Sequence, residues 1–186
     1  MADEERDEFR ESLEQYIGKS LVKGGPAVAP DPVNQAMIHN WIDAFEDFNP
    51  VYEHEDIAAQ TRFGGKVAPQ AMLQTWTMPR PIIKGIGDRG GSPTEIDPDS
   101  PIELMANAGY VGTLATNSEL NFKRALREGD HLTSDVVLSS ISPRKKTGLG
   151  LGYFVEWITT YTDQHGEEVG SQIFRILKFN PHTIGQ

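Results

Sequence analysis

Apolar residues recur at helical spacing through the first half of the chain. On an acidic background they appear every three or four residues from Phe9 to Ile17, which predicts a surface helix that Gly18 ends. A second helix is predicted after a cap at Asp31-Pro32, and we expect it to end near Asn49-Pro50 because proline disfavours helix in the residue before it. The apolar positions expected on one face of this helix are Val33, Met37, Trp41, Ile42 and Phe45.

The rest of the pattern predicts a buried helix, a long loop and a sheet. Most sides of the segment from Pro69 to Met78 are apolar, which favours a buried helix. Residues 80–112 are rich in Gly, Pro and Asp, as is typical of a lid or binding loop, with a short helix expected near residues 102–108. Alternating apolar residues predict strands over residues 118–125, 131–142, 150–162 and 168–179, with turns at residues 143–148 and 163–166. These elements indicate an α+β fold in which an antiparallel sheet wraps around a buried helix.

Composition narrows the possible functions. The 186 residues carry a formal net charge of -10, which argues against a nucleic-acid or anionic-membrane partner, because such surfaces cluster Lys and Arg. There is no cysteine, which excludes disulfides and thiolate chemistry, and the five histidines lack metal-ligand spacing, so we expect no metal or other cofactor. No apolar run reaches the roughly 20 residues of a membrane span, and the acidic start from Met1 to Glu5 differs from a signal peptide. We therefore expect one cytoplasmic domain over residues 1–186.

Two neighbouring segments are the most informative about chemistry. The segment from Phe45 to His54 contains Asp47 and Asn49-Pro50, and the segment from Phe63 to Pro69 forms a Gly-rich entry to the expected buried helix. Together they resemble the MaoC-like enoyl-CoA hydratase family, whose signature is Asp, any residue, Asn-Pro, an aliphatic residue and then His. Tyr52 stands at the position of that His. The resemblance extends to the Arg-x-Gly-Asp turn that begins at Arg127, and it implies a hot-dog fold with a central helix.

In the family, as the resemblance implies, an Asp and a His activate a water that adds to a trans-2-enoyl-CoA thioester. Tyrosine, with a pKa near 10, is a poor base at neutral pH, which leaves Asp47 without its partner. His54 would share a face with Tyr52 if the segment were extended, and the alternative is an exposed loop histidine.

Further candidate residues concern binding of the CoA thioester. Backbone amides near the helix entry, at Gly64, Gly65, Val67 and Ala68, could receive the thioester oxygen, or the glycines could serve only a tight turn. A segment similar to the family's basic hairpin near the CoA phosphates contains Arg144, Lys145, Lys146 and Gly148, and a solvated turn is the alternative. An acyl-CoA is thus expected as substrate, with no other cofactor.

The resemblance also implies a partner. From about Met1 to Asn180 the chain is similar to the MaoC-like amino-terminal domain of larger subunits of the actinobacterial hydratases for the steroid side chain. In such enzymes a second, smaller hot-dog subunit supplies the Asp and His, and a longer protein continuing past Gln186 would bind a downstream aldolase. The alternatives are a self-sufficient homodimeric hydratase or dehydratase that uses Asp47, and a non-catalytic acyl-CoA-binding or scaffold module. A hot-dog thioesterase is disfavoured, because residues 69–78 contain no acidic side chain.

Overall fold

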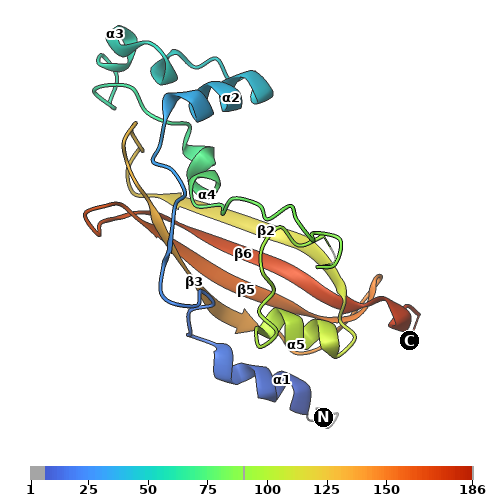
Figure 1. The fold of residues 1–186 in the computed structure, drawn as a ribbon. Helices are drawn as coiled ribbons and strands as arrows, with labels where there is room; N and C mark the ends of the chain where they lie inside the picture. Colours follow the sequence, from blue (N-terminus) through green and yellow to red (C-terminus); the bar gives the residue numbers. More distant parts are fainter. Residues whose placement is uncertain (1–6, 90, 186) are drawn as a thin grey trace.

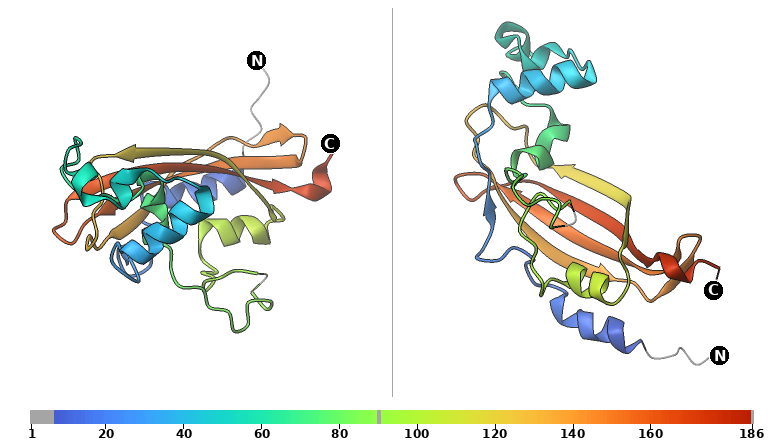
Figure 2. Two further views of the ribbon diagram at one scale, coloured as in Figure 1. Left: turned by 90° about the horizontal axis from the view of Figure 1, so that it is seen from above. Right: turned by 45° about the vertical axis from the view of Figure 1, so that its right-hand side comes forward.

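The protein is built on a curved antiparallel sheet with its helices on one face (Figures 1 and 2). The computed structural model describes residues 7–89 and 91–185, so the acidic start from Met1 to Glu5 lies outside the described residues. The strand order is β1-β3-β5-β6-β2, and β4 pairs with β5. The strands are β1 (Ala27–Val28), β2 (Gly112–Phe122), β3 (Thr133–Ile141), β4 (Lys145–Thr147), β5 (Gly150–Thr162) and β6 (Glu168–Asn180).

The helices are short. The α-helices are α1 (Glu8–Leu13), α2 (Gln35–Phe45), α3 (Glu55–Ala58), α4 (Leu73–Trp76) and α5 (Pro101–Asn107). Single 3₁₀ turns are η1 (Glu14–Tyr16), η2 (Pro50–Tyr52), η3 (Gln70–Met72) and η4 (Pro181–Thr183). Within the described part of the chain, no helix is long and apolar enough to cross a membrane.

The α+β prediction is confirmed, and the sheet supports it most clearly in β5. Tyr153, Val155 and Tyr161 lie on the covered face and are at most 1% exposed, as the alternating pattern predicts. The expected turn at residues 163–166 closes the hairpin, with the Gly166 N–H donating to the carbonyl of Asp163 at 3.0 Å. Three features were missed: β1 was not predicted, β2 begins at Gly112, well before the predicted residue 118, and β4 lies within the predicted turn at residues 143–148.

The predicted start and end of α2 are wrong. Asn34, not Asp31, caps the helix, because its side chain accepts the N–H of Met37 at 3.0 Å. The Asp31 carboxylate instead accepts two hydrogen bonds from Arg80, at 2.9 and 3.1 Å. The helix ends at Phe45, because Glu46 adopts the left-handed conformation with φ 54°.

The predicted buried face of α2 is only partly correct. Val33 and Ile42 are buried as expected, but Ile38 completes the buried face. Met37 and Phe45 are 40% and 64% exposed, so the prediction that they share that face is wrong.

The helix at the centre of the fold is shorter than predicted. It consists of η3 followed by α4. Its apolar residues Met72, Leu73 and Trp76 are buried in one cluster with the sheet residues Tyr161 and Val169. The α-helical conformation ends at Trp76 rather than Met78. Among the described residues between α4 and α5 there is no further helix or strand, and α5 confirms the short helix expected near residues 102–108.

Candidate functional site

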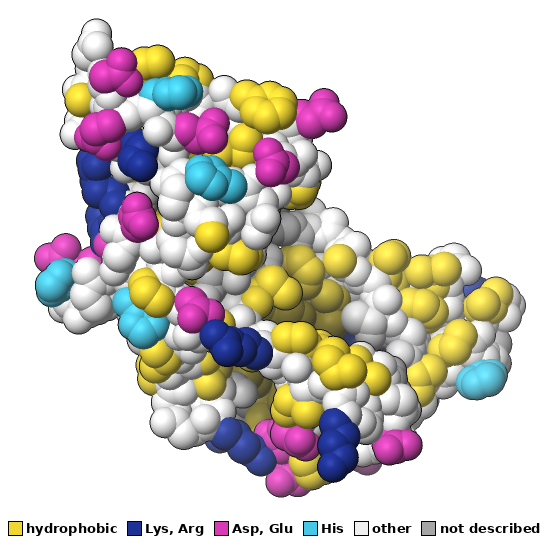
Figure 3. Space-filling model, turned by 45° about the horizontal axis from the view of Figure 1, so that its top comes forward, with side chains coloured by type: hydrophobic (Ala, Val, Ile, Leu, Met, Phe, Trp, Pro, Cys, Tyr) yellow, Lys and Arg dark blue, Asp and Glu magenta, His cyan; other side chains and the backbone are white. Residues whose placement is uncertain are grey.

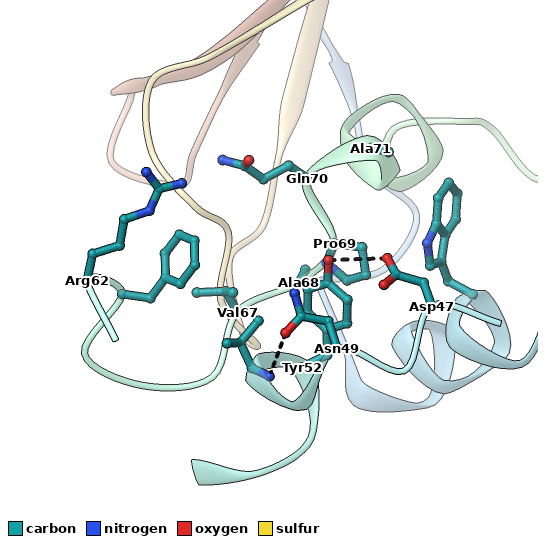
Figure 4. A pocket seen from close by; sticks show the side chains of 12 residues that line it. Asp47, Asn49, Tyr52, Arg62, Val67, Ala68, Pro69, Gln70 and Ala71 are labelled. Atoms are coloured by element: carbon teal, nitrogen blue, oxygen red, sulfur yellow. Dashed lines mark hydrogen bonds between the residues drawn. The ribbon is translucent and has the colours of Figure 1, made fainter. Parts of the chain in front are cut away.

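The two informative segments meet at a cavity of about 370 Å³ beside the start of η3 (Figure 4). The cavity is lined by Trp41, Asp47, Asn49, Val51, Tyr52, Arg62, Phe63, Val67, Ala68, Pro69, Gln70 and Ala71. The structure therefore brings together Asp47, Tyr52, Val67 and Ala68 among the residues singled out from the sequence.

Local backbone geometry directs Asp47 and Tyr52 toward each other. The left-handed Glu46 turns the chain out of α2, and the Asp47 N–H donates to the carbonyl of Ile42 at 3.2 Å. The Asn49 side chain then accepts the N–H of Val51 at 3.2 Å and caps η2. This turn places the Tyr52 hydroxyl over the Asp47 carboxylate (Figure 4).

Tyr52 acts as a hydrogen-bond donor to Asp47. Its hydroxyl donates to Asp47 Oδ2 at 3.3 Å. Burial raises the pKa of Tyr52, and the charge of Asp47 and this hydrogen bond raise it further. The phenol therefore keeps its proton at neutral pH and cannot replace histidine as a base.

His54 does not replace the missing histidine. The chain at Pro50–Tyr52 forms the 3₁₀ turn η2, so the extended segment on which this hypothesis depended is not present. The His54 side chain is exposed at the start of α3 and does not line the cavity. The alternative, an exposed loop histidine, matches its position.

Gly64 and Gly65 form a tight turn behind the cavity wall. Both have positive φ, 64° and 151°. A Cβ atom at Gly65 would lie 2.8 Å from Arg127 Nη1 and 3.2 Å from Glu55 Oε1. The turn explanation for these glycines is therefore confirmed.

The expected amide donors are already occupied. The N–H of Gly65 donates to the carbonyl of Ala58 at 3.2 Å, and the N–H of Val67 donates to the carbonyl of Val51 at 3.2 Å. The N–H of Ala68 donates to the carbonyl of Leu126 at 2.8 Å. This corrects the expectation that these groups are free to receive a thioester oxygen. Free donors occur instead at the first two N–H groups of η3, because a helix start leaves its first N–H groups without intrahelical acceptors. These belong to Gln70 and Ala71, which line the cavity and have no acceptor among the described residues.

An arginine on the turn before β3 holds the glycine turn in place. Arg127 donates from Nη1 to the carbonyl of Lys66 at 3.2 Å and from Nη2 to the carbonyl of Phe63. Its own N–H donates to the Asp130 carboxylate at 2.8 Å, which fixes the Arg-x-Gly-Asp turn.

A second arginine anchors that turn to the sheet. Arg124 donates to Asp130 at 2.7 and 3.0 Å and to Asp163 at 2.8 Å. The Arg124 guanidinium, aided by backbone N–H groups, lowers the pKa of Asp163 to about 2. The wall of the cavity is thus connected by charge-assisted hydrogen bonds to the β5–β6 hairpin.

The basic hairpin lies away from this cavity within the chain. Its residues Lys145–Thr147 pair with the start of β5, whereas Tyr161 at the other end of β5 pairs with Gly170, near the turn that supports the cavity. The 13 residues of β5 span about 40 Å. The structure therefore does not bring Arg144, Lys145, Lys146 or Gly148 to the cavity, and their CoA-binding role stays a prediction.

The positively charged side chain at the first cavity, Arg62, was not predicted from the sequence. Arg62 is exposed at the cavity, with its guanidinium 4.9 Å from the centre of the Phe63 ring. A single arginine in a loop has no pattern by which to find it. Among the described residues, no group of His, Asp and Glu side chains is arranged to hold a metal ion.

A second cavity, of about 290 Å³, lies between α4 and the covered face of the sheet. It is lined by Val22, Ala27, Gln74, Thr77, Met78, Pro79, Ser134, Val136, Trp157, Thr159, Tyr161, Gln172 and Phe174. The rings of Trp157 and Phe174 lie 5.3 Å apart and form an aromatic wall. The surface view also shows hydrophobic side chains gathered in a hollow below the helices (Figure 3).

Comparison with known proteins agrees with this geometry. A family model described as the FAS1-like dehydratase domain region matches residues 25–172. A probable enoyl-CoA hydratase alpha subunit from Thermomonospora curvata is 38% identical over 182 residues, 97% of this chain and 54% of the relative. A 3-oxo-4,17-pregnadiene-20-carboxyl-CoA hydratase alpha subunit from Mycobacterium tuberculosis is 40% identical over 158 residues, 84% of this chain and 48% of the relative. The chain spans about half the length of these curated relatives.

A solved structure is similar over nearly the whole chain. A chain of the ChsH1-ChsH2 complex from Mycobacterium tuberculosis matches with a TM-score of 0.78 and 35% identity, covering 94% of this chain and 92% of the other. The expected hot-dog fold and the resemblance to MaoC-like hydratases are thereby confirmed. The chain belongs to the FAS1-like dehydratase-region family of MaoC-like hot-dog proteins.

Proposed function

We propose that the chain is the supporting subunit of a heteromeric enoyl-CoA hydratase. In this proposal it shapes the acyl-CoA site, while a smaller hot-dog subunit supplies the Asp and His that activate water. The observation that carries the proposal is the hydroxyl of Tyr52, the residue at the family's His position, which donates a hydrogen bond to Asp47. The matched relatives from two organisms are named alpha subunits, which supports a partner subunit.

The two cavities suggest how the chain would serve the reaction. The thioester oxygen would accept hydrogen bonds from the free N–H groups of Gln70 and Ala71, where negative charge develops as water adds to the β-carbon. The partner's base would remove the proton from water, and its acid would protonate the α-carbon. The acyl group would enter the aromatic cavity beyond α4, which suits a bulky group such as the steroid side-chain acyl group named for one relative.

An unpaired sheet edge supports assembly with another chain. Among the described strands, β2 pairs only with β6, and most of its residues are exposed. Val111, directly before β2, and Leu114, within it, are 57% and 47% exposed. A long, exposed edge strand with apolar residues is a common docking surface for another chain.

A second candidate function also has an observation in its favour. Asp47 and a protonated Tyr52 lie together in the cavity and could act as base and acid in a self-sufficient homodimeric hydratase.

Replacing Asp47 by Asn distinguishes between the supporting subunit and the self-sufficient hydratase. In a complex with a small hot-dog subunit, we expect Asp47→Asn to leave kcat within a few-fold, since the amide keeps an oxygen that can accept the hydrogen bond from the Tyr52 hydroxyl. If Asp47 is the base, kcat should fall by about 10² to 10⁴. Asp43→Asn, on the exposed side of α2, is the matched control. Binding of acyl-CoA without turnover in any mixture would instead indicate the scaffold alternative.

A further inference from the structure

A network of polar side chains crosses the floor of the second cavity. The Tyr161 hydroxyl donates to Gln172 Oε1 at 3.1 Å, and both residues are buried. Gln172 Nε2 donates to Gln74 Oε1 at 3.1 Å and to Ser118 Oγ at 3.0 Å. The network thus links the sheet to the central helix through one amide, whose two N–H donors and carbonyl oxygen are all used.

The network sets the direction of the Gln74 amide. The Tyr161 hydroxyl donates its hydrogen bond to the carbonyl oxygen of Gln172. The Gln172 carbonyl oxygen therefore faces Tyr161, and its NH₂ group faces Gln74. Because the Gln74 oxygen accepts this bond, the Gln74 NH₂ group faces away from the network.

The Gln74 NH₂ group is available to a ligand. Gln74 is exposed and lines the cavity, and its Nε2 has no acceptor among the described residues. The walls on either side are apolar, with Trp157 and Phe174 from the sheet and Met78 from the chain after α4. An oriented amide donor between apolar walls is suited to recognise an oxygen atom on an otherwise apolar ligand, and the hydroxyl groups of Thr77, Ser134 and Thr159 line the same cavity.

Gln74 lies at a suitable distance from the proposed thioester site. Gln70 lines the first cavity and Gln74 the second, and residues i and i+4 share a helix face. Four residues of η3 and α4 span roughly 6 to 8 Å. Gln70 and Gln74 therefore lie about one turn apart on the central helix, each beside one of the two cavities, and the proposal takes the acyl group to run from one cavity to the other.

We propose that Gln74 is a specificity-determining residue that donates a hydrogen bond to a carbonyl or hydroxyl oxygen at the far end of a bulky acyl group. The proposal rests on the proposed function, because it assumes that the thioester lies in the first cavity. It adds that the preferred acyl group carries an oxygen remote from the thioester. An entirely hydrocarbon acyl group of the same shape would leave the Gln74 amide unpaired, at a cost in affinity.

The test measures binding of two thioesters to the chain by titration calorimetry. One is 3-oxo-4,17-pregnadiene-20-carboxyl-CoA, and the other is the same compound with a methylene group in place of the 3-oxo oxygen. We expect wild type to bind the oxo compound about tenfold more tightly. Gln74→Glu keeps the acceptor for Gln172 but replaces the outward NH₂ by an oxygen, so this preference should vanish or reverse. Gln164→Glu, in the exposed β5–β6 turn, adds the same charge and should leave the preference unchanged.

Each outcome has a definite meaning. If Gln74→Glu binds the oxo compound with the wild-type preference, the role of Gln74 is excluded while the proposed function stands. If wild type binds both compounds equally, the proposal is also overturned. If wild type binds neither compound, alone or with a small hot-dog subunit, the proposed acyl-CoA site itself is contradicted. Circular dichroism of each variant, together with Gln74→Ala as a second variant without added charge, separates loss of recognition from loss of folding.

Discussion

Replacement of Arg124 by Gln is expected to destabilise the fold at the wall of the first cavity. The change removes hydrogen bonds of 2.7, 3.0 and 2.8 Å to Asp130 and Asp163. A hydrogen bond to a charged group contributes about 1.5 to 3 kcal/mol when buried, but the Arg124 side chain is 36% exposed, so solvent screening reduces the gain. We expect the free energy of unfolding to fall by about 2 kcal/mol in total, which lowers Tm by roughly 4 to 8 °C for a chain of this size.

The same interaction has a pH dependence whose sign follows from Asp163. The folded-state pKa of this carboxyl, about 2, lies below the ordinary value of 3.8 for a free aspartate. The stabilisation is therefore fully present above about pH 4 and is lost as the pH falls through 2. The difference in unfolding free energy between wild type and Arg124→Gln should accordingly be largest near pH 7 and shrink toward pH 2.

Urea unfolding at pH 7, 4 and 2.5 measures both effects. Arg80→Gln is the matched control, because Arg80 forms a more exposed pair with Asp31, whose loss should barely change the free energy of unfolding. Equal midpoints for wild type and Arg124→Gln at pH 7, or a deficit that grows toward pH 2.5, would refute the reasoning.

Three further predictions concern the glycine turn at Gly65, the cation Arg62 and the exposed edge strand β2. Gly65→Ala should destabilise the chain by about 1 to 3 kcal/mol in thermal unfolding, because φ is 151° and the new Cβ would meet Arg127; an unchanged Tm would contradict this. Arg62→Gln should weaken binding of an acyl-CoA more than binding of the matching acyl-pantetheine, which lacks the nucleotide phosphates; equal losses by calorimetry would exclude a phosphate contact. Leu114→Lys on β2 should reduce association with a small hot-dog subunit in analytical ultracentrifugation without lowering Tm, and unchanged association would remove this edge from the interface.

Much of the sheet could be predicted from the sequence, because burial of one face imposes a period of two. The alternation through β5 placed Tyr153, Val155 and Tyr161 on the covered face. The start of β2 could not be found in this way, since an edge strand with little burial has no need for alternation. Helix ends were missed for a different reason: the cap at Asn34 and the left-handed Glu46 are decided by single side-chain and backbone contacts, which periodicity does not report.

The site was predictable where residues lie close together in sequence. Asp47 and Tyr52 were expected to share a site, and one turn of chain does bring them into contact. Arg62 and Gln74 were missed, because their positions depend on how separate segments pack and neither belongs to a motif. The amide donors were expected at residues 64–68, but backbone hydrogen bonds to other segments occupy most of those groups.

The proposed supporting role of this chain is tested most directly by the initial rate of hydration of a steroid trans-2-enoyl-CoA. The rate is measured with the chain alone, with a small hot-dog subunit alone, and with mixtures of increasing ratio. Because Tyr52 occupies the position of the family's base, we expect almost no turnover by the chain alone and a rate that rises to a plateau at a fixed ratio of the two subunits. Turnover by the lone chain at the rate of the mixture would contradict the account and would assign the proton transfers to Asp47.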